Sequence, residues 1–341
     1  MRVLVTGDRG YIGRILVPRL LEEGHDVRGL DTDYYEGCDL YEHGEADYER
    51  LTKDVRELTK RDLEGVDAVH HLAALSNDPL GTLDPTLTHE INHEATVRLA
   101  RLAKESGVER FVFSSSCSVY GTSEGAVVDE TSETNPLTAY ARSKVSVEEA
   151  LREMADSSFT PVFLRNATAH GLSPRLRLDI VVNNLVGWAH ATGEVVIKSD
   201  GKPWRPLVHI ADISKAFELA TSADADAVRG EAFNVGDNDE NYQIRELAAI
   251  VGETVPDVTV TYGDDPSPDA RSYRVNFDKI GDRLGFSCDW DVPSGAAELS
   301  EAYSEAGMDE ATFQSDAYRR LDRIETLREG GELDDGLLWR D

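Results

Sequence analysis

The first 31 residues constrain the fold more than any other segment of this chain. A short apolar run from Arg2 to Thr6 leads into the glycine-rich turn TGDRGYIG. A helical pattern from Tyr11 to Glu23 and a second predicted strand from Asp26 to Leu30 follow. Glycines at such a turn allow a tight bend, close approach of the backbone to a phosphate, and close packing of the helix on the strand. The helix N-terminus adds free N–H groups and a positive dipole. This order predicts a β-α-β unit that binds a dinucleotide.

The acidic residue Asp31, which follows the second predicted strand, indicates which dinucleotide the chain binds. Asp31 lies 18 residues beyond Gly13, where a carboxylate accepts hydrogen bonds from the adenosine ribose hydroxyls. The same carboxylate repels the 2′-phosphate of NADP, and no Arg follows it. A turn-forming acid is the weaker alternative, because a strand and a glycine loop precede Asp31. We therefore predict NAD as the cofactor, in contact with Asp31 and the loop residues Gly7, Gly10, Tyr11, Ile12 and Gly13.

Strands and helices alternate through the first half of the chain. Further strands are expected at Val66–Leu72, Arg110–Ser114 and Pro161–Arg165, with helices from about Thr86 to Ser106 and from about Ala139 to Ala155. This alternation predicts an α/β fold, a Rossmann doubly wound parallel sheet with a smaller mixed α/β substrate-binding domain.

The weakening of this alternation after Asn166 suggests a domain division. We expect an NAD-binding domain over 1–165, joined by part of 205–240 because the run FNVG at 233–236 can return to the main sheet. The substrate-binding domain then covers 166–341. Its last stretch, from about Glu298 to Asp341, is acidic and helix-prone and predicts a solvated terminal helix.

Charge narrows the choice of partners. The chain has 65 acidic and 35 basic residues and a formal net charge of -30. Such a surface repels nucleic acid and anionic membranes, so neither is an expected partner. The acids are spread over the whole chain and only eight of the basic residues are Lys. This pattern favours a halophilic source, with an acidic mesophilic protein as the alternative.

The location and metal content are predicted from smaller signals. No apolar run is long enough to span a membrane, and the N-terminus lacks the pattern of a signal peptide, so a cytoplasmic protein is expected. Three widely spaced cysteines form no CxxC pair and fit a reducing compartment. The adjacent His70 and His71 point to opposite faces of a strand, and we expect no structural metal.

A base and its neighbours form the candidate catalytic group. Tyr140 and Lys144 lie four residues apart on a predicted helix and so leave the same face. A free tyrosine has a pKa near 10, and a nearby ammonium favours its phenolate form. Ser116, in the strand end FVFSSS, can hold a substrate hydroxyl together with Tyr140.

These motifs together resemble the extended short-chain dehydrogenase/reductase family, in particular its NAD-dependent nucleotide-sugar epimerases and dehydratases. The resemblance extends to about residue 290 and rests on TGDRGYIG, Asp54-Val55, HLAA at 71–74, SSSCSVYG at 114–121, YARSK at 140–144 and WRPLVHIADI at 204–213. It implies that Ser116, Tyr140 and Lys144 are catalytic. It also implies further cofactor contacts from Asp54, Val55, Leu72, Ala73, Ala74, Asn92, Ser114, Tyr140 and Lys144, and substrate contacts from Ser116, Asn183, Asn184, Leu185, Arg205 and Arg271.

Departures from the family pattern narrow the chemistry. In the dehydratases an Asp-Glu pair follows the catalytic hydroxyl, whereas here Cys117-Ser118 follow Ser116. We expect Cys117 to be a buried structural thiol. His170 replaces a common Tyr, and a packed loop histidine is favoured over a substrate contact.

The sequence allows two interpretations of two arginines in the predicted substrate-binding domain. Arg175 and Arg177 lie in the loop SPRLRLD at 173–179. They can bind a pyrophosphate, because guanidinium forks suit this group. They can equally be solvent-facing loop charges or form salt bridges to the acidic surface.

The resemblance implies a nucleotide-sugar epimerase that acts at C4 through a transient 4-keto sugar. The alternatives are a nucleotide-sugar dehydrogenase, reductase or dehydratase and, less favoured, an inactive NAD-binding module. The family also forms homodimers through two helices, which correspond here to about 86–106 and 139–155.

Overall fold

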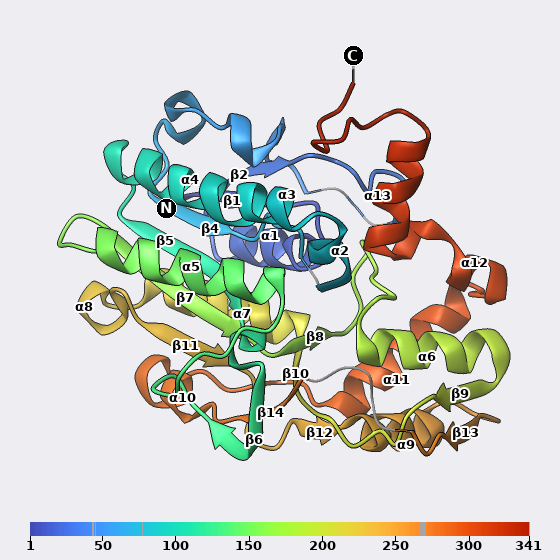
Figure 1. Ribbon diagram of the computed structural model, residues 1–341. Helices are drawn as coiled ribbons and strands as arrows, with labels where there is room; N and C mark the ends of the chain where they lie inside the picture. Colours follow the sequence, from blue (N-terminus) through green and yellow to red (C-terminus); the bar gives the residue numbers. More distant parts are fainter. Residues whose placement is uncertain (43, 45, 77, 266–270, 341) are drawn as a thin grey trace.

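The protein has an α/β architecture around one central parallel sheet (Figure 1). The computed structural model describes residues 1–341 except 43, 45, 77, 266–270 and 341. The sheet has seven strands in the order β11-β7-β5-β4-β1-β2-β3, all paired in parallel. Its strands are β1 (Arg2–Thr6), β2 (Asp26–Asp31), β3 (Glu49–Thr52), β4 (Ala68–His71), β5 (Arg110–Ser116), β7 (Thr160–Asn166) and β11 (Ala232–Val235).

Helices cover both faces of the sheet. Val3 and Val5 of β1 pack toward α1 (Gly13–Glu22) and α7 (Ile210–Ser222), while Leu4 packs toward α4 (Ala95–Glu105) and α5 (Ala139–Met154). Successive side chains of a strand point to opposite faces, so both faces of β1 are buried and the strand reads as an uninterrupted apolar run. The predicted Rossmann fold is confirmed.

Two details of the sheet differ from expectation. The strand β3 was not predicted, because this edge strand, ERLT, has no apolar run and its residues are exposed or half-buried. The helix expected from about Thr86 to Ser106 consists of α3 (Pro85–His89), a π-helical turn (Glu90–Glu94) and α4 in direct succession. Asp84 caps its start by accepting hydrogen bonds from the N–H groups of Thr86 and Leu87.

A second core lies beyond the carboxyl edge of the central sheet. It combines α6 (Val181–Thr192), α9 (Ile244–Thr254) and α11 (Val292–Glu305) with a three-stranded sheet of β12 (Asn241–Gln243), β10 (Trp204–His209) and β8 (Thr168–His170). Two further strand pairs are β13 (Thr259–Tyr262) with β9 (Glu194–Ile197), which packs in this core, and β14 (Ser272–Val275) with β6 (Thr122–Val128), which packs in the core of the central sheet. Shorter helices are α2 (Asp78–Leu83), α8 (Ala225–Val228), α10 (Asp278–Leu284) and α12 (Glu310–Gln314).

The C-terminal segment corrects one expectation. The last helix, α13 (Arg320–Glu329), is packed rather than solvated, because Ile324, Leu327, Leu333 and Leu337 are at most 1% exposed. They form a small core with Tyr34 after β2 and with residues of α2, α3 and the π-helical turn. Figure 1 shows α13 beside α2, at the end of the molecule where the chain terminates. The excess of charged residues hid the apolar stripe in the sequence.

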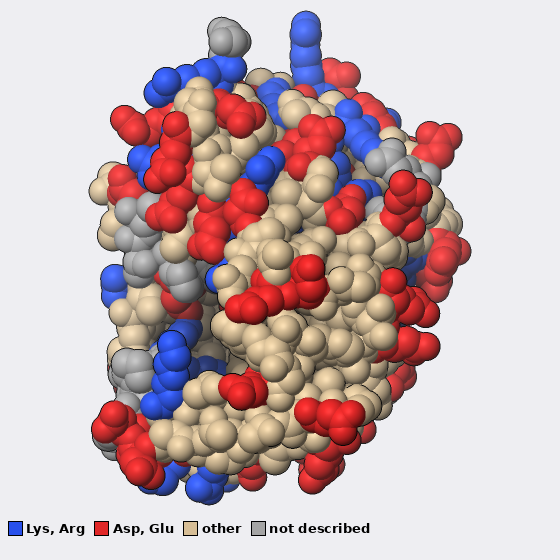
Figure 2. All heavy atoms as spheres, turned by 90° about the vertical axis from the view of Figure 1, so that its right-hand side faces the viewer, with Lys and Arg blue, Asp and Glu red and all other residues tan. Residues whose placement is uncertain are grey.

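The surface carries the acidic residues in a scattered distribution. Figure 2 shows separate groups of Asp and Glu side chains scattered over one face of the molecule, with other residues between them, and basic side chains at the edge of a hollow. None of the described helices is both long and apolar enough to cross a membrane.

The packing of α13 can be tested by cavity formation. Replacing Ile324 by Ala should lower the free energy of unfolding by about 2–4 kcal/mol, because a fully buried side chain loses its contacts. Replacement of the exposed neighbour Glu325 by Ala should change this free energy by less than about 0.5 kcal/mol. Urea unfolding of both variants measures the difference, and equal stabilities would show that α13 does not belong to the folded core.

Candidate active site

A cavity of about 680 Å³ lies at the carboxyl ends of β1, β2, β4 and β5. Loops at this edge of a parallel α/β sheet form its ligand site. Most of the residues predicted as site residues line the cavity: Gly7, Gly10, Tyr11, Ile12, Gly13, Asp31, Asp54, Val55, Leu72, Ala73, Ala74, Ser114, Ser116, Tyr140, Lys144, Asn184, Arg205 and Arg271.

The glycine loop has no room for side chains. Gly7 has φ +77°, and a Cβ atom on it would lie 2.9 Å from the backbone nitrogen of Ala73. A Cβ atom on Gly13 would lie 2.2 Å from the carbonyl oxygen of Gly7. Both contacts are far shorter than van der Waals distance, so the turn requires glycine at these positions. The result is a bare backbone cradle at the start of α1, which fits the diphosphate of a dinucleotide.

Asp31 is held at the end of β2 in the position expected for a ribose ligand. Its carboxylate accepts hydrogen bonds from the backbone N–H of Arg9 (3.2 Å) and of Asp33 (3.0 Å). The side chain therefore has a fixed orientation on the cavity wall. Its lone pairs also suit ribose hydroxyls, so the loop and Asp31 together fit NAD.

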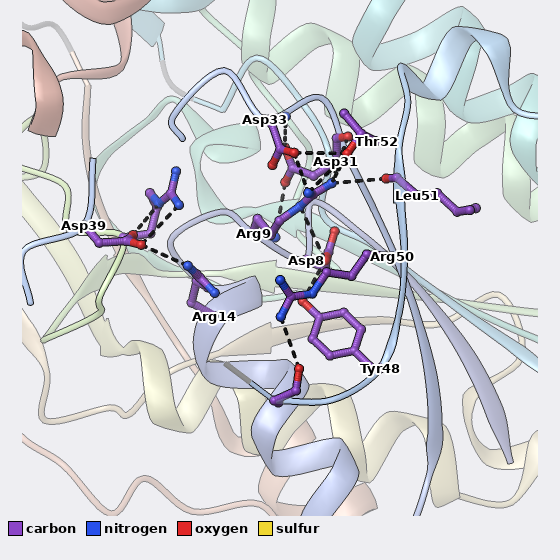
Figure 3. Close-up of polar contacts among 12 residues, drawn as sticks. Asp8, Arg9, Arg14, Asp31, Asp33, Asp39, Tyr48, Arg50, Leu51 and Thr52 are labelled. Carbon is purple, nitrogen blue, oxygen red and sulfur yellow. Dashed lines mark hydrogen bonds and ion pairs between the residues drawn. The ribbon is translucent and has the colours of Figure 1, made fainter. Parts of the chain in front are cut away.

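The back of the glycine loop contains a buried charge cluster that the sequence analysis missed (Figure 3). Asp8 is fully buried and accepts a hydrogen bond from the Tyr48 hydroxyl at 2.9 Å. Burial, and then the neighbouring charge of Asp31, raise the pKa of Asp8 to about 7. The Arg9 guanidinium pairs with Asp33 and donates to the carbonyl oxygens of Asp31 and Leu51. The consecutive charged residues Asp8 and Arg9 in the sequence GDRG were the signal that could have predicted this cluster.

The predicted catalytic residues meet on one wall of the cavity. Tyr140 and Ser116 both line the cavity, and Ser116 is close enough to the Tyr140 hydroxyl to lower its pKa. Burial, and then the nearby charge of Asp78, raise the pKa of Tyr140 to about 12, while Arg177 and Ser116 act in the opposite direction. The Tyr140 hydroxyl is therefore protonated at neutral pH in the protein alone, and it needs additional positive charge to act as a base.

Lys144 lies beneath Tyr140. Its Nζ atom donates to the carbonyl oxygen of Ser114 at 2.7 Å and lies 5.4 Å from the centroid of the Tyr140 ring. Burial lowers the pKa of Lys144, and although the charge of Glu148 opposes this effect, the resulting pKa is about 7. The lysine is thus poised to change charge near neutral pH, within reach of the tyrosine.

The comparisons with known proteins agree with this geometry. The sequence pattern of the NAD dependent epimerase/dehydratase family matches residues 3–236. The UDP-glucose 4-epimerase of Mycolicibacterium smegmatis is 30% identical over 315 residues, which cover 89% of this chain and 98% of that protein. The uncharacterized UDP-glucose epimerase YtcB of Bacillus subtilis is 31% identical over 251 residues, which cover 69% of this chain and 77% of that protein.

The chain belongs to the NAD-dependent epimerase/dehydratase family. Among solved structures, MoeE5 in complex with UDP-glucose and NAD is 27% identical, with a TM-score of 0.78 over 90% of this chain and 99% of MoeE5. The NAD-dependent NDP-hexosamine 5,6-dehydratase TunA is 24% identical with a TM-score of 0.79, over 89% of this chain and 98% of TunA, and shares the fold.

Three residues predicted as ligand contacts lie outside the cavity wall of this family member. Asn92 binds the backbone N–H and carbonyl of Leu75 and so positions a segment that does line the cavity. Asn183 is fully buried and bonds to Gly171 and to the Tyr11 hydroxyl. Leu185 packs in the second core. Helical geometry explains the last two, because Asn184 alone of the run Asn183–Leu185 faces the cavity.

Arg175 and Arg177, for which the sequence left two interpretations, differ in the structure. Arg175 is buried in an ion pair with Asp39, its Nε atom 2.7 Å from a carboxylate oxygen, and does not line the cavity. Arg177 lines the cavity, where it forms a two-pronged pair with Asp179 and a bond to Ser76. Salt bridging therefore holds for both, but only Arg177 reaches the ligand space.

The remaining sequence expectations concern buried groups. Cys117 is 1% exposed and its Sγ atom lies 3.0 Å from the carbonyl oxygen of Arg165, so it is a structural thiol as predicted. His170 is packed edge-on against His209, with centroids 5.3 Å apart. His70 and His71 point to opposite faces of the sheet. His70 forms a hydrogen bond with Thr221, and His71 forms hydrogen bonds with Thr6 and Thr96. Within the described residues, no cluster of His, Cys, Asp and Glu could hold a metal ion.

The buried Asp8 gives a pH-dependent stability. Its folded pKa of about 7 exceeds the usual 3.8, so between these values the folded protein keeps a proton that the unfolded chain loses. Stability therefore falls as pH rises through this window. Asp8→Asn removes the effect, and its stability relative to the unmodified protein should rise by about 2 kcal/mol between pH 5 and pH 8.

Urea unfolding at the two pH values and constant ionic strength measures this difference. The exposed carboxylate variant Glu329→Gln is the control and should show the same difference from the unmodified protein at both pH values. A constant offset for Asp8→Asn would contradict a buried, proton-binding Asp8.

Proposed function

We propose that the protein is an NAD-dependent nucleotide-sugar epimerase that inverts C4 of the sugar through a transient 4-keto intermediate. The observation that carries the proposal is the meeting of Ser116, Tyr140 and Lys144 on one wall of the cavity that holds the glycine loop. The relatives named as UDP-glucose 4-epimerases, one of which aligns over 98% of its length, support this reaction.

The roles of the three residues follow from their chemistry. NAD, held by the glycine loop and Asp31, supplies a hydride acceptor that is regenerated in each cycle. Tyr140 takes the proton of the sugar hydroxyl, and Ser116 hydrogen-bonds the same oxygen and orients it toward Tyr140. Lys144 is charged at pH values below its lowered pKa, and its Nζ atom lies 5.4 Å from the centroid of the Tyr140 ring. Its charge stabilises the phenolate form of Tyr140. Burial of Lys144 in the cavity wall strengthens its charge interactions.

Arginines further along the cavity suit the diphosphate of a nucleotide sugar. Arg205 lies on β10, with its guanidinium carbon 5.7 Å from the centroid of the Tyr273 ring, and its Nη1 atom donates to the carbonyl oxygen of Arg271 at 2.5 Å. Arg271 pairs with Asp78 in the same wall. Guanidinium groups recognise diphosphates by paired hydrogen bonds. The names of the relatives favour a UDP-hexose as the substrate.

The second candidate is a dehydratase or net redox reaction of the same family. Water elimination needs an acid and a base beside the catalytic hydroxyl. At that place Cys117 turns into the core, and Ser118 donates its backbone N–H to Ser116. These contacts favour epimerisation. Stoichiometric release of NADH would instead indicate a dehydrogenase.

The mechanism predicts a large effect of one hydroxyl. Tyr140→Phe should lower turnover by about 10²–10⁴-fold, because the general base is lost. The affinity for NAD should stay within about threefold, since the glycine loop is unchanged. The matched control is Tyr262→Phe, which alters an exposed tyrosine outside the cavity. Unchanged turnover of the Tyr140 variant would refute the mechanism.

The turnover assay also identifies the substrate. The protein is incubated with UDP-, dTDP-, GDP- and CDP-hexoses, and the stereochemistry of the sugar is followed by NMR. A C4 epimer formed without net change in NADH absorbance is the expected product. A 4-keto-6-deoxy sugar would identify a dehydratase.

We also propose that the protein is a cytoplasmic homodimer from a halophilic source. The three free thiols fit a reducing compartment, and α4 and α5 lie side by side on the outer layer of the fold as a candidate interface (Figure 1). At a net charge of -30, added salt screens repulsion within the folded state.

The salt dependence gives a direct test of this proposal. The thermal midpoint should rise by several degrees or more between 0.1 M and 2 M KCl. Sedimentation in the same salt series should give twice the chain mass of 37.6 kDa. A thermal midpoint that is highest at 0.1 M KCl would contradict a halophilic protein, and the single chain mass at high salt would contradict the dimer.

A further inference from the structure

Arg320, the first residue of α13, is a buried cation on the wall of the cavity. Arg320 is 3% exposed, and its Nη2 atom donates a hydrogen bond to the carbonyl oxygen of Arg175 at 3.2 Å. The guanidinium carbon lies 4.0 Å from the centroid of the Tyr35 ring. Within the described part of the chain, the Nη1 atom has no hydrogen-bond partner.

The charge of Arg320 is incompletely balanced by the protein. The nearby carboxylate Asp179 is engaged by Arg177, with N–O distances of 2.8 Å and 3.0 Å. Among the described residues, no salt bridge joins Arg320 to a carboxylate. A buried cation with a free donor is costly unless it meets an anion. Arg177, Arg320 and Asp179 together carry one net positive charge on the cavity wall.

The position of this cluster indicates which anion it meets. The Arg320 guanidinium covers the ring of Tyr35, which lines the cavity together with Asp31, the expected ligand of the adenosine ribose. Arg177 lines the same cavity as Tyr11 of the glycine loop and Tyr140. The two arginines therefore share one cavity with both ends of the expected cofactor site. In a dinucleotide, the diphosphate is the group between its two ribose rings.

We propose that Arg320, together with Arg177, binds the diphosphate of NAD as a second contact besides the glycine loop, so that the C-terminal segment 320–340 holds the cofactor in place. This inference concerns cofactor binding and does not depend on which sugar reaction the protein catalyses.

The docking of the C-terminal segment supports a holding role. The Trp339 indole N–H donates to the carbonyl oxygen of Thr32 at 2.6 Å, and the Tyr34 hydroxyl donates to that of Leu337. Thr32, Tyr34 and Tyr35 all line the cavity. The segment is thus anchored to the cavity wall at the adenosine end, and its charged end, Arg320, reaches the ligand. Release of NAD then requires loss of an ionic contact in the cavity as well as loss of the loop contacts.

The test uses the full-length chain freed of cofactor, with variants Arg320→Gln and Arg320→Lys. The control is Arg323→Gln on the same helix, which removes a bond to the carbonyl oxygen of Tyr34 but no cavity-lining group. Calorimetric titration measures the affinity for ADP-ribose, adenosine and UDP. These probes separate the cofactor diphosphate, the adenosine site and the sugar-nucleotide diphosphate.

We expect Arg320→Gln to weaken ADP-ribose binding by about 10–100-fold, as for loss of a charge-assisted hydrogen bond to a phosphate. Arg320→Lys should recover part of this loss, and Arg323→Gln should bind as the unmodified protein does. Adenosine and UDP affinities should stay unchanged in all variants.

Several outcomes would overturn the proposal. Unchanged ADP-ribose affinity in Arg320→Gln would show that Arg320 is structural. An equal loss for adenosine would indicate collapse of the adenosine site, and a loss confined to UDP would assign Arg320 to the sugar nucleotide. The thermal midpoint without ligand reports folding. Should Arg320→Gln fail to fold, Arg320→Lys decides, with an expected loss of about 3–10-fold for ADP-ribose alone and an unchanged affinity as the contradicting result.

Discussion

The approach of the Gly7 backbone to the backbone of Ala73 determines the arrangement of the site. A single methyl group on Gly7 would lie 2.9 Å from the Ala73 nitrogen, so the first and fourth strands can end side by side only because this residue has no side chain. Their proximity places the glycine loop, Asp31 and the strand end at Leu72–Ala74 around one cavity. It also directs the start of α1 at the ligand space. The cofactor site is thus a property of backbone packing.

Most of the buried charged side chains described around this cavity form ion pairs, and two buried cations do not. Glu148 and Arg165 form a buried ion pair that is completed by Ser115 and Tyr120, and it carries no free donor into the site. Lys144 and Arg320 differ, because each is a buried cation without a carboxylate at salt-bridge distance among the described residues. Unpaired charge in a low-dielectric site interacts strongly with whatever enters it. Such residues are therefore the expected points of contact with cofactor and substrate.

The fold could be predicted to a large extent because its signals are local. The apolar runs of β1, β2, β5 and β7 and the periodicity of the helices reflect burial on both faces of the sheet, and each predicted strand is present within about two residues. The strand β3 was missed because an edge strand lacks this pattern. The C-terminal helix was misjudged because its two buried apolar residues, Ile324 and Leu327, are separated by charged neighbours. Only contacts with residues more than 200 positions earlier reveal its core.

The sequence by itself predicted the α/β fold and the candidate site residues: the glycines and Asp31 lie in one β-α-β unit, and Ser116, Tyr140 and Lys144 stand in motifs that resemble those of the family. The tertiary structure decided which other side chains share their cavity. Asn184 faces the ligand space while Asn183 is buried, and Arg177 reaches it while Arg175 does not. Arg320 enters it from the far end of the chain. Such choices depend on how separate elements pack, and residues distant in sequence carry no local pattern that records their contact.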